Sequence, residues 1–177
     1  MRTVVLLTAV AASLILDACG AWQSASDTTS NAYHAVFHKQ VKTLNLDLTA
    51  RASLNPDEAD RPVSVAVRVY QLKDRQSFDA ASYDDLLKHD RAVLAADLQD
   101  SAGVVVNPGS AASVSQPMRA DTGYVAVVAF FRDVKDDHDW RRVISKQSMS
   151  VSEPLRFELV DRELVALTEA PRQRPAR

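Results

Sequence analysis

The sequence has 177 residues, a length that fits one domain with short extensions. Apolar residues make up 46% and charged residues 25%, the balance of a globular protein, and the formal net charge is -2. This charge provides no basic excess for binding nucleic acid, and four glycines are too few for glycine-rich phosphate loops. The single cysteine, Cys19, excludes an internal disulfide and a cysteine-based zinc site.

Residues 1–18 are predicted to be a lipoprotein signal peptide. Val4–Leu16 is an uncharged run of 13 residues behind Arg2. It is shorter than the ~20 residues that span a bilayer and suits the apolar region of a signal peptide. The following Leu-Asp-Ala-Cys, ending at Cys19, resembles a lipobox, in which the cysteine is lipidated and becomes the first residue. Asp17 departs from the usual small residue, and a plain secretory signal cut elsewhere is the alternative.

The residues after the cleavage site predict how the domain is held. Gly20 directly follows the cysteine, at the position where an aspartate retains many lipoproteins at the inner membrane. By resemblance to such lipoproteins, we therefore expect this protein to be located at the outer membrane. Residues 19–40 are predicted to be the lipidated cysteine and a flexible tether, because residues 21–31 are mostly small and polar without an apolar period. Two acyl chains already hold a protein stably, because each buried CH₂ contributes about 0.8 kcal/mol.

From residue 41 onward, apolar residues repeat with a period of two, which is typical of strands with one buried face. Leu44, Leu46 and Leu48 alternate with polar residues. The expected strands are Leu44–Thr49, Val63–Tyr70, Val104–Val106, Ala112–Gln116, Tyr124–Phe131, Arg141–Ser145, Leu155–Val160 and Glu163–Thr168. The continuously apolar Tyr124–Phe131 suits a central strand buried on both faces.

One stretch, Asp79–Asp100, interrupts the strands and predicts one or two short helices. Ser82 with Asp85 three residues later is a capping-type helix start. The pattern as a whole predicts an all-β protein, a two-sheet β-sandwich of about eight strands with short inserted helices, spanning residues 41–169. Residues 170–177 are predicted to be a disordered tail.

Residue types that carry chemistry do not form a recognisable set. His34 and His38 lack a third metal ligand nearby, and no nucleophile motif is present. The acidic cluster Asp133–Asp139 lacks the glycine and the final glutamate of a calcium-binding loop, which favours a solvated hairpin tip. Trp140 is interpreted as a core residue rather than an exposed contact. We therefore expect no enzyme, no metal and no cofactor beyond the lipid on Cys19.

The most polar connection between two confident strands is Asn-Pro-Asp-Glu-Ala-Asp-Arg-Pro, residues 55–62. Its two prolines limit flexibility and its three acids give it a negative face. Composition alone favours an ordinary solvated loop.

Several segments, in this order, resemble the outer-membrane lipoprotein family of type VI secretion, called TssJ or SciN. They are Arg61–Leu72, Phe78, Ser82–Leu87, Asn107–Gly109, Tyr124–Arg132 and Trp140–Arg141. The Val-Arg-Val-Tyr-Gln-Leu string at 67–72 is the most specific of them. The resemblance covers Thr43 to Ile144 together with the lipobox.

The resemblance implies a transthyretin-like sandwich, without catalysis, that is lipid-anchored on the periplasmic face of the outer membrane. It implies a structural role in the type VI membrane complex, in which the partner is the periplasmic domain of TssM, an IcmF-like inner-membrane subunit. In the family, the loop between the first two strands is identified with TssM binding. That loop is here Asn55, Pro56, Asp57, Glu58, Ala59, Asp60 and Arg61.

A different class of function stays open at this point. A periplasm-facing ligand-binding or enzymatic lipoprotein could use a similar sandwich. The missing nucleophile and metal ligands favour the structural role, with no small-molecule substrate and no nucleic acid as partner.

Overall fold

The protein is described by a computed structural model that defines residues 41–134 and 139–167. Cys19, the predicted signal peptide, the predicted tether, His34, His38 and the predicted tail lie outside the described residues. From Val41 onward, the described residues belong to one compact unit. In the part of the chain that is described, no helix is long and apolar enough to cross a bilayer.

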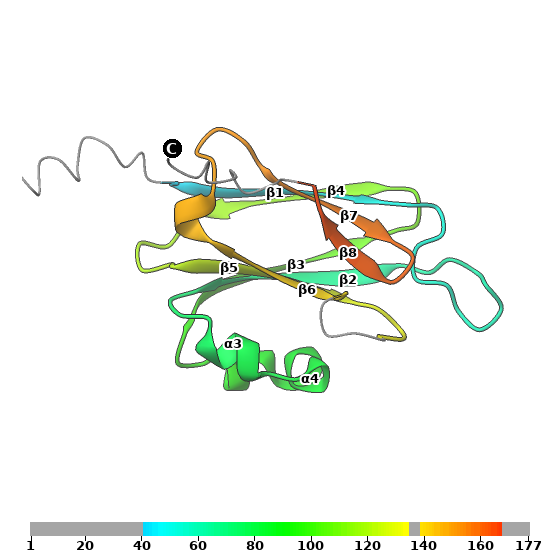
Figure 1. Ribbon diagram of the computed structural model, residues 1–177, viewed down its shortest axis with the longest axis horizontal. Coiled ribbons are helices and arrows are strands. Elements are labelled where there is room, and N and C mark those ends of the chain that lie inside the picture. The colour runs from blue at the N-terminus through cyan, green and yellow to red at the C-terminus, as the bar shows by residue number, and fades with distance from the viewer. Residues whose placement is uncertain (1–40, 135–138, 168–177) are drawn as a thin grey trace, which may run out of the picture. The chain divides into compact units, whose positions relative to one another are not determined.

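In residues 41–134 and 139–167, eight strands form two four-stranded sheets that face each other (Figure 1). In chain order the elements are β1 (Thr43–Ala50), β2 (Val65–Leu72), α3 (Gln76–Ala80), α4 (Tyr83–Val93), β3 (Leu98–Val106), β4 (Ala111–Pro117), β5 (Tyr124–Phe130), β6 (Arg141–Ser145), the 3-10 helix η1 (Lys146–Ser148), β7 (Leu155–Val160) and β8 (Glu163–Ala166). The β1 sheet has the order β4-β1-β7-β8, and the β2 sheet has the order β3-β2-β5-β6. Only β1 and β7 pair in parallel among these described neighbours.

The core between the sheets follows directly from the period-two pattern. Alternate residues of a strand point to one face, so a run such as Leu-Asn-Leu-Asp-Leu places all its leucines inside. The inward residues are Leu44, Leu46 and Leu48 from β1, Val65, Val67 and Val69 from β2, Val125 and Val127 from β5, and Leu155, Phe157 and Leu159 from β7. Burying each of these side chains contributes about 1.5–3 kcal/mol to folding.

The two helices cover the outer face of the β2 sheet (Figure 1). Phe78 of α3 and Leu86 of α4 are fully buried. The Phe78 ring lies 6.3 Å from the ring of Tyr70, which belongs to β2. This layer explains why β5 is apolar at every position: Val125 to Phe130 are all buried, with the sandwich core on one face and the helices on the other.

Tyr83, the first residue of α4, joins the helix to the sheet. Its ring packs edge-on against Phe130 and Trp140, with centroids 5.7 Å and 5.0 Å away. Its hydroxyl donates to the carbonyl oxygen of Phe131 at 2.6 Å, and burial raises the pKa of Tyr83 to about 12. The phenol therefore stays protonated at neutral pH and keeps its role as donor.

The expected all-β sandwich is confirmed, and so is the burial of Trp140. Ser82 caps α4, with a reciprocal capping box to Asp85. The expected helical range, Asp79–Asp100, is wrong at both ends. The first helix begins at Gln76, and the last residues of that range already belong to β3, which starts at Leu98 rather than Val104. This segment has no strong apolar alternation of its own, and it becomes a strand because β2 supplies its ladder of hydrogen bonds.

We expect Val67→Ala to lower the free energy of unfolding by about 1–3 kcal/mol, because Val67 is fully buried between the sheets and its truncation leaves a cavity. Chemical denaturation of the two proteins measures this difference. Val151→Ala, at a position 45% exposed, is the control and should change stability little. Equal losses in the two variants would contradict the assigned core.

Candidate partner-binding loop

The β1–β2 loop, residues 51–64, lies at the end of the sandwich where three other connections gather. Strand register places them there: Thr49 pairs with Ala111 at the start of β4, and Ala50 pairs with Leu159 near the end of β7. On the other sheet, Ala66 pairs with Phe130 at the end of β5. The β3–β4, β5–β6 and β7–β8 connections therefore surround the base of the β1–β2 loop, which projects from this end (Figure 1).

Asn55 fixes the base of the loop. Its side chain is 2% exposed and its φ of 49° lies in the left-handed region, which asparagine tolerates better than most residues. Its backbone N–H donates to the carbonyl oxygen of Asp161 at 2.5 Å. Its Oδ1 accepts from the backbone N–H of Arg132 at 2.8 Å. One buried residue thus connects the β1–β2 loop to both the β5–β6 connection, through its side chain, and the β7–β8 connection, through its backbone.

Asp57 organises the tip of the loop. Its Oδ1 accepts from the backbone N–H groups of Ala59, at 2.9 Å, and Arg61, at 3.0 Å. Its Oδ2 accepts from Nε of Arg61 at 2.9 Å. The backbone and then the side chain of Arg61 hold the pKa of Asp57 below its ordinary value. The carboxylate therefore stays ionised at neutral pH, and the tip keeps its own internal hydrogen bonds.

Two arginines brace the loop from neighbouring connections. Nη2 of Arg162 donates to the carbonyl oxygen of Pro56 at 2.9 Å. Nη2 of Arg132 contacts Oε1 of Glu58 at 3.1 Å, but Glu58 is 94% exposed, so this ion pair contributes little to stability. The loop is therefore held through its backbone, and the carboxylate of Glu58 remains available to a partner.

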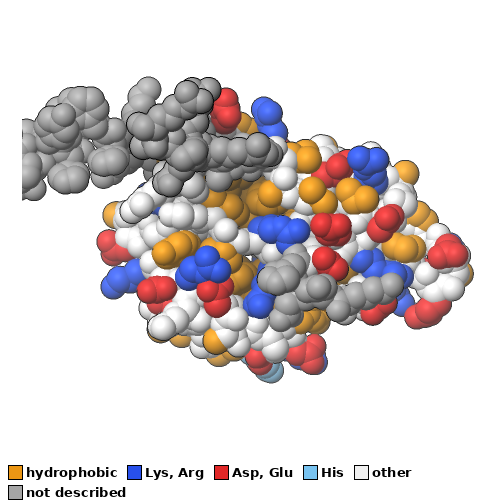
Figure 2. All heavy atoms as spheres, in the orientation of Figure 1, with side chains coloured by type: hydrophobic (Ala, Val, Ile, Leu, Met, Phe, Trp, Pro, Cys, Tyr) orange, Lys and Arg blue, Asp and Glu red, His pale blue; other side chains and the backbone are white. Residues whose placement is uncertain are grey.

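The predicted site residues fall into two groups. Asn55 is buried and Pro56 and Asp57 are half-buried, so these three shape the loop. Glu58, Ala59, Asp60 and Arg61 are exposed and form the surface that another molecule would meet. Figure 2 shows acidic side chains at this end of the molecule, with basic side chains beside them. Composition identified the loop but could not distinguish the two groups.

Sequence reasoning missed Arg132, Asp161 and Arg162 as parts of this site. Arg132 directly follows the expected strand Tyr124–Phe131, and Asp161 and Arg162 form the short connection between the expected strands Leu155–Val160 and Glu163–Thr168. Nothing local linked these residues to residues 55–61. The acidic cluster at Asp133–Asp139 is described only at its ends, where Asp133 is exposed and Asp139 is half-exposed. Among the described residues, no group of acidic, histidine or cysteine side chains could hold a metal ion.

Comparison with known proteins assigns the family. The model of the T6SS-SciN family, described as type VI secretion lipoprotein, VasD, EvfM, TssJ, matches residues 42–162. The chain belongs to the type VI secretion lipoprotein family. The match spans β1 to β7, both helices and the complete β1–β2 loop, and it ends just before β8.

Solved structures agree with membership of the TssJ family. A chain in a structure described as "Type VI membrane complex" is 35% identical, with a TM-score of 0.69, over 73% of this chain and all of that one. A chain in a structure described as "T6SS protein TssM C-terminal domain (869-1107) from EAEC" is 32% identical, with a TM-score of 0.65 and the same coverage. The T6SS lipoprotein TssJ1 from Pseudomonas aeruginosa, 24% identical with a TM-score of 0.59 over 77% of this chain and 98% of that one, shares the fold. No curated protein matches this chain.

We expect Asn55→Ala to lower the free energy of unfolding by about 1–3 kcal/mol, because the Arg132 N–H loses its acceptor in a partly buried place. Alanine is also strained at a positive φ. Asn55→Gly should therefore be more stable than Asn55→Ala by roughly 1 kcal/mol, although it loses the same acceptor. Thermal unfolding of both variants measures the contribution of the lost hydrogen bond and that of the backbone strain. Glu58→Gln, at an exposed position, is the neutral control. If the Ala variant were as stable as the Gly variant, the predicted strain of alanine at a positive φ would be contradicted.

Proposed function

We propose that this lipoprotein links the outer membrane to the type VI secretion membrane complex by binding the periplasmic domain of a TssM-type, IcmF-like subunit through its β1–β2 loop. It acts as a structural protein without catalysis. The observation that carries the proposal is the construction of the loop. Buried Asn55 and the contacts of Asp57 hold it in one conformation, while Glu58 to Arg61 stay exposed.

A loop held in this way suits binding. Association costs free energy when loops and side chains must be ordered, so a loop with fixed backbone gives up less on meeting a partner. Binding residues are often found on loops that a rigid scaffold positions. The exposed acids Glu58 and Asp60 would steer a basic surface toward the loop and make association sensitive to salt.

The choice of partner draws on family membership and on two structural neighbours. One chain with this fold, which is matched along its full length, occurs in a structure described as the C-terminal domain of TssM. Another occurs in a structure described as a type VI membrane complex. Both support a TssM-type partner for this chain.

We expect Glu58→Lys combined with Asp60→Asn to weaken binding of the purified TssM-type periplasmic domain by about tenfold, because a basic partner surface would meet an added positive charge. Asparagine keeps the positive φ of Asp60, 56°, so the loop retains its shape. Titration calorimetry at two salt concentrations measures the change in affinity.

The control carries the same change of net charge at the opposite end of the sandwich. Glu153→Lys combined with Asp121→Asn alters two exposed residues in the β6–β7 and β4–β5 connections. This variant should bind like the wild type. Equal affinities for the loop variant and the control would show that the interface does not include the β1–β2 loop. The β5–β6 connection, which contains Asp133, would then be tested.

The membrane anchor is a second part of the proposal. We propose that the chain is cleaved before Cys19, lipidated there, and held on the periplasmic face of the outer membrane. Cys19→Ser should release the protein from the membrane fraction, because an acyl anchor can no longer form. Fractionation and intact-mass measurement test this. The domain should unfold at an unchanged temperature, since residue 19 precedes β1 by more than twenty residues. A serine variant that still sediments with outer membranes would overturn the anchor.

A further inference from the structure

The free edge of β3 is unlike the other sheet edges. β3 has nine residues and ends the β2 sheet, so one of its edges has no neighbouring strand among the described residues. Within the described chain, the backbone of residues 101–105 has no backbone partner other than β2. A long, unpaired strand edge is a template for pairing with another chain.

Native proteins normally protect such edges with charge, proline or short strands. The other edge strands of this protein follow that rule: β4 ends in Pro117, β6 has five residues and β8 has four. By contrast, the Ser-Ala-Gly-Val-Val stretch at 101–105 contains neither charge nor proline. A Cβ added at Gly103 would meet only the Val67 carbonyl oxygen, at 3.9 Å. Among the described residues, the face of the sheet at Gly103 is therefore not covered by other side chains.

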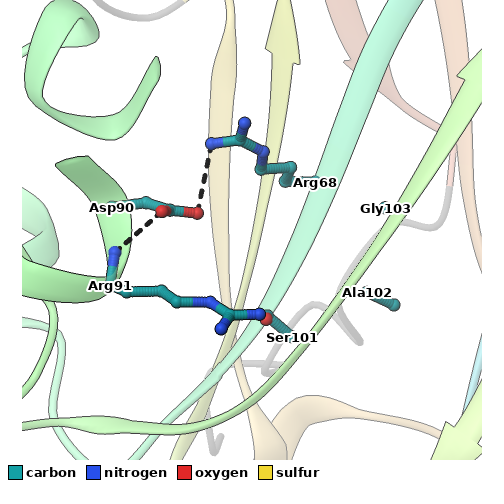
Figure 3. A pocket seen from close by; sticks show the side chains of 6 residues that line it. All are labelled: Arg68, Asp90, Arg91, Ser101, Ala102 and Gly103. Carbon is teal, nitrogen blue, oxygen red and sulfur yellow. Dashed lines mark hydrogen bonds and ion pairs between the residues drawn. The ribbon is translucent and has the colours of Figure 1, made fainter. Parts of the chain in front are cut away.

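A cationic cavity of about 300 Å³ lies beside this bare stretch (Figure 3). It is lined by Arg68, Asp90, Arg91, Ser101, Ala102 and Gly103. Register places Arg68 opposite Gly103 and Ala66 opposite Val105, so these four residues share one face of the sheet. Val105, 62% exposed, is the next residue along β3 on that face.

Within the described part of the chain, the charges around the cavity leave one cation, the guanidinium of Arg91, without a partner. Nη1 of Arg68 contacts Oδ2 of Asp90 at 3.1 Å, and the Tyr70 hydroxyl donates to the same oxygen at 3.0 Å. Asp90 is therefore satisfied within the protein. Arg91 uses its backbone N–H to contact Asp90, but among described residues its guanidinium has no hydrogen bond or ion pair. Figure 3 shows this side chain extending from α4 toward β3.

We propose that the β3 edge binds an extended segment of a partner protein as an added strand, with an acidic side chain of that segment received by Arg91. Side chains two residues apart on a strand share a face and lie about 7 Å apart. The segment therefore carries an apolar residue, two positions from the acid, which packs against Val105. Main-chain hydrogen bonds to β3 provide affinity, and the cavity and Val105 select the sequence.

This surface fits a partner better than a second copy of the chain. Antiparallel pairing of two β3 edges around Gly103 would bring two Arg91 guanidinium groups to the same stretch, where like charges repel. An acidic segment of a partner would instead be attracted to Arg91. The β3 edge is also distinct from the β1–β2 loop, so one molecule has room for two contacts.

Selection from a displayed library of random eight-residue peptides, on the full chain in detergent, tests the proposal. The library should be enriched in peptides with an acid and an apolar residue two positions apart. That enrichment should vanish on Arg91→Glu and on Val105→Lys, both at exposed positions, and persist on Lys73→Glu. No enrichment, enrichment of unrelated sequences, or dimerisation through β3 in light scattering would overturn the proposal.

Exchange of charges between Arg91 and one selected peptide is the decisive experiment. Changing its acid to lysine should weaken binding about tenfold or more, and Arg91→Glu should restore binding of the lysine peptide. Only every second N–H group of an added strand faces β3. N-methylation of that set of peptide amides should therefore abolish binding, whereas N-methylation of the other set should not. Binding insensitive to either change would overturn the added-strand geometry, as would competition by acetate alone at equal concentration.

Discussion

The burial of the central strand pair β2–β5 on both faces is the constraint on which the rest of the domain depends. On one face Val67 and Val127 meet the leucines of β1 and β7, and on the other Phe130 meets Tyr83 of α4. The only cysteine lies before the domain, so no disulfide restrains the unfolded chain, and hydrophobic burial must offset the conformational entropy of folding. The helices are therefore structurally necessary, because without them β5 would expose an apolar face.

A pair of strands fixed in this way gives the loops at its ends a firm base. The β1–β2 loop gains its shape from this base rather than from its prolines alone. Asn55 contacts connections that lie 77 and 106 residues further along the chain, at Arg132 and Asp161. Because these contacts are buried or made through the backbone, the outward side chains of the loop can change without disturbing the fold. The structural base of the loop is therefore separate from its exposed surface.

A sandwich of two open sheets leaves strand edges that a closed barrel would not have. In this protein three edges are short or carry proline, whereas the edge of β3 is long and bare over Ser101 to Val105. The same layer of helices that seals the sheet also sets Arg91 beside that edge. In the proposed structural role, a second contact surface would raise overall avidity without tighter single sites, because linked contacts reinforce one another.

The sequence by itself determined the elements whose signal is local. Period-two alternation located β1, gave the bounds of β6 and β7 without error, and marked β5 as doubly buried. Ser82 with Asp85 marked a helix start, and the Cys19 motif predicted the anchor, which lies outside the described residues. Tertiary structure alone decided that β1 pairs in parallel with β7, that β3 extends back to Leu98, and that Asn55 is a buried anchor while Glu58 is exposed. The physical reason is range: alternation and caps act over a few residues, whereas strand pairing and buried hydrogen bonds join segments that only the folded chain brings together.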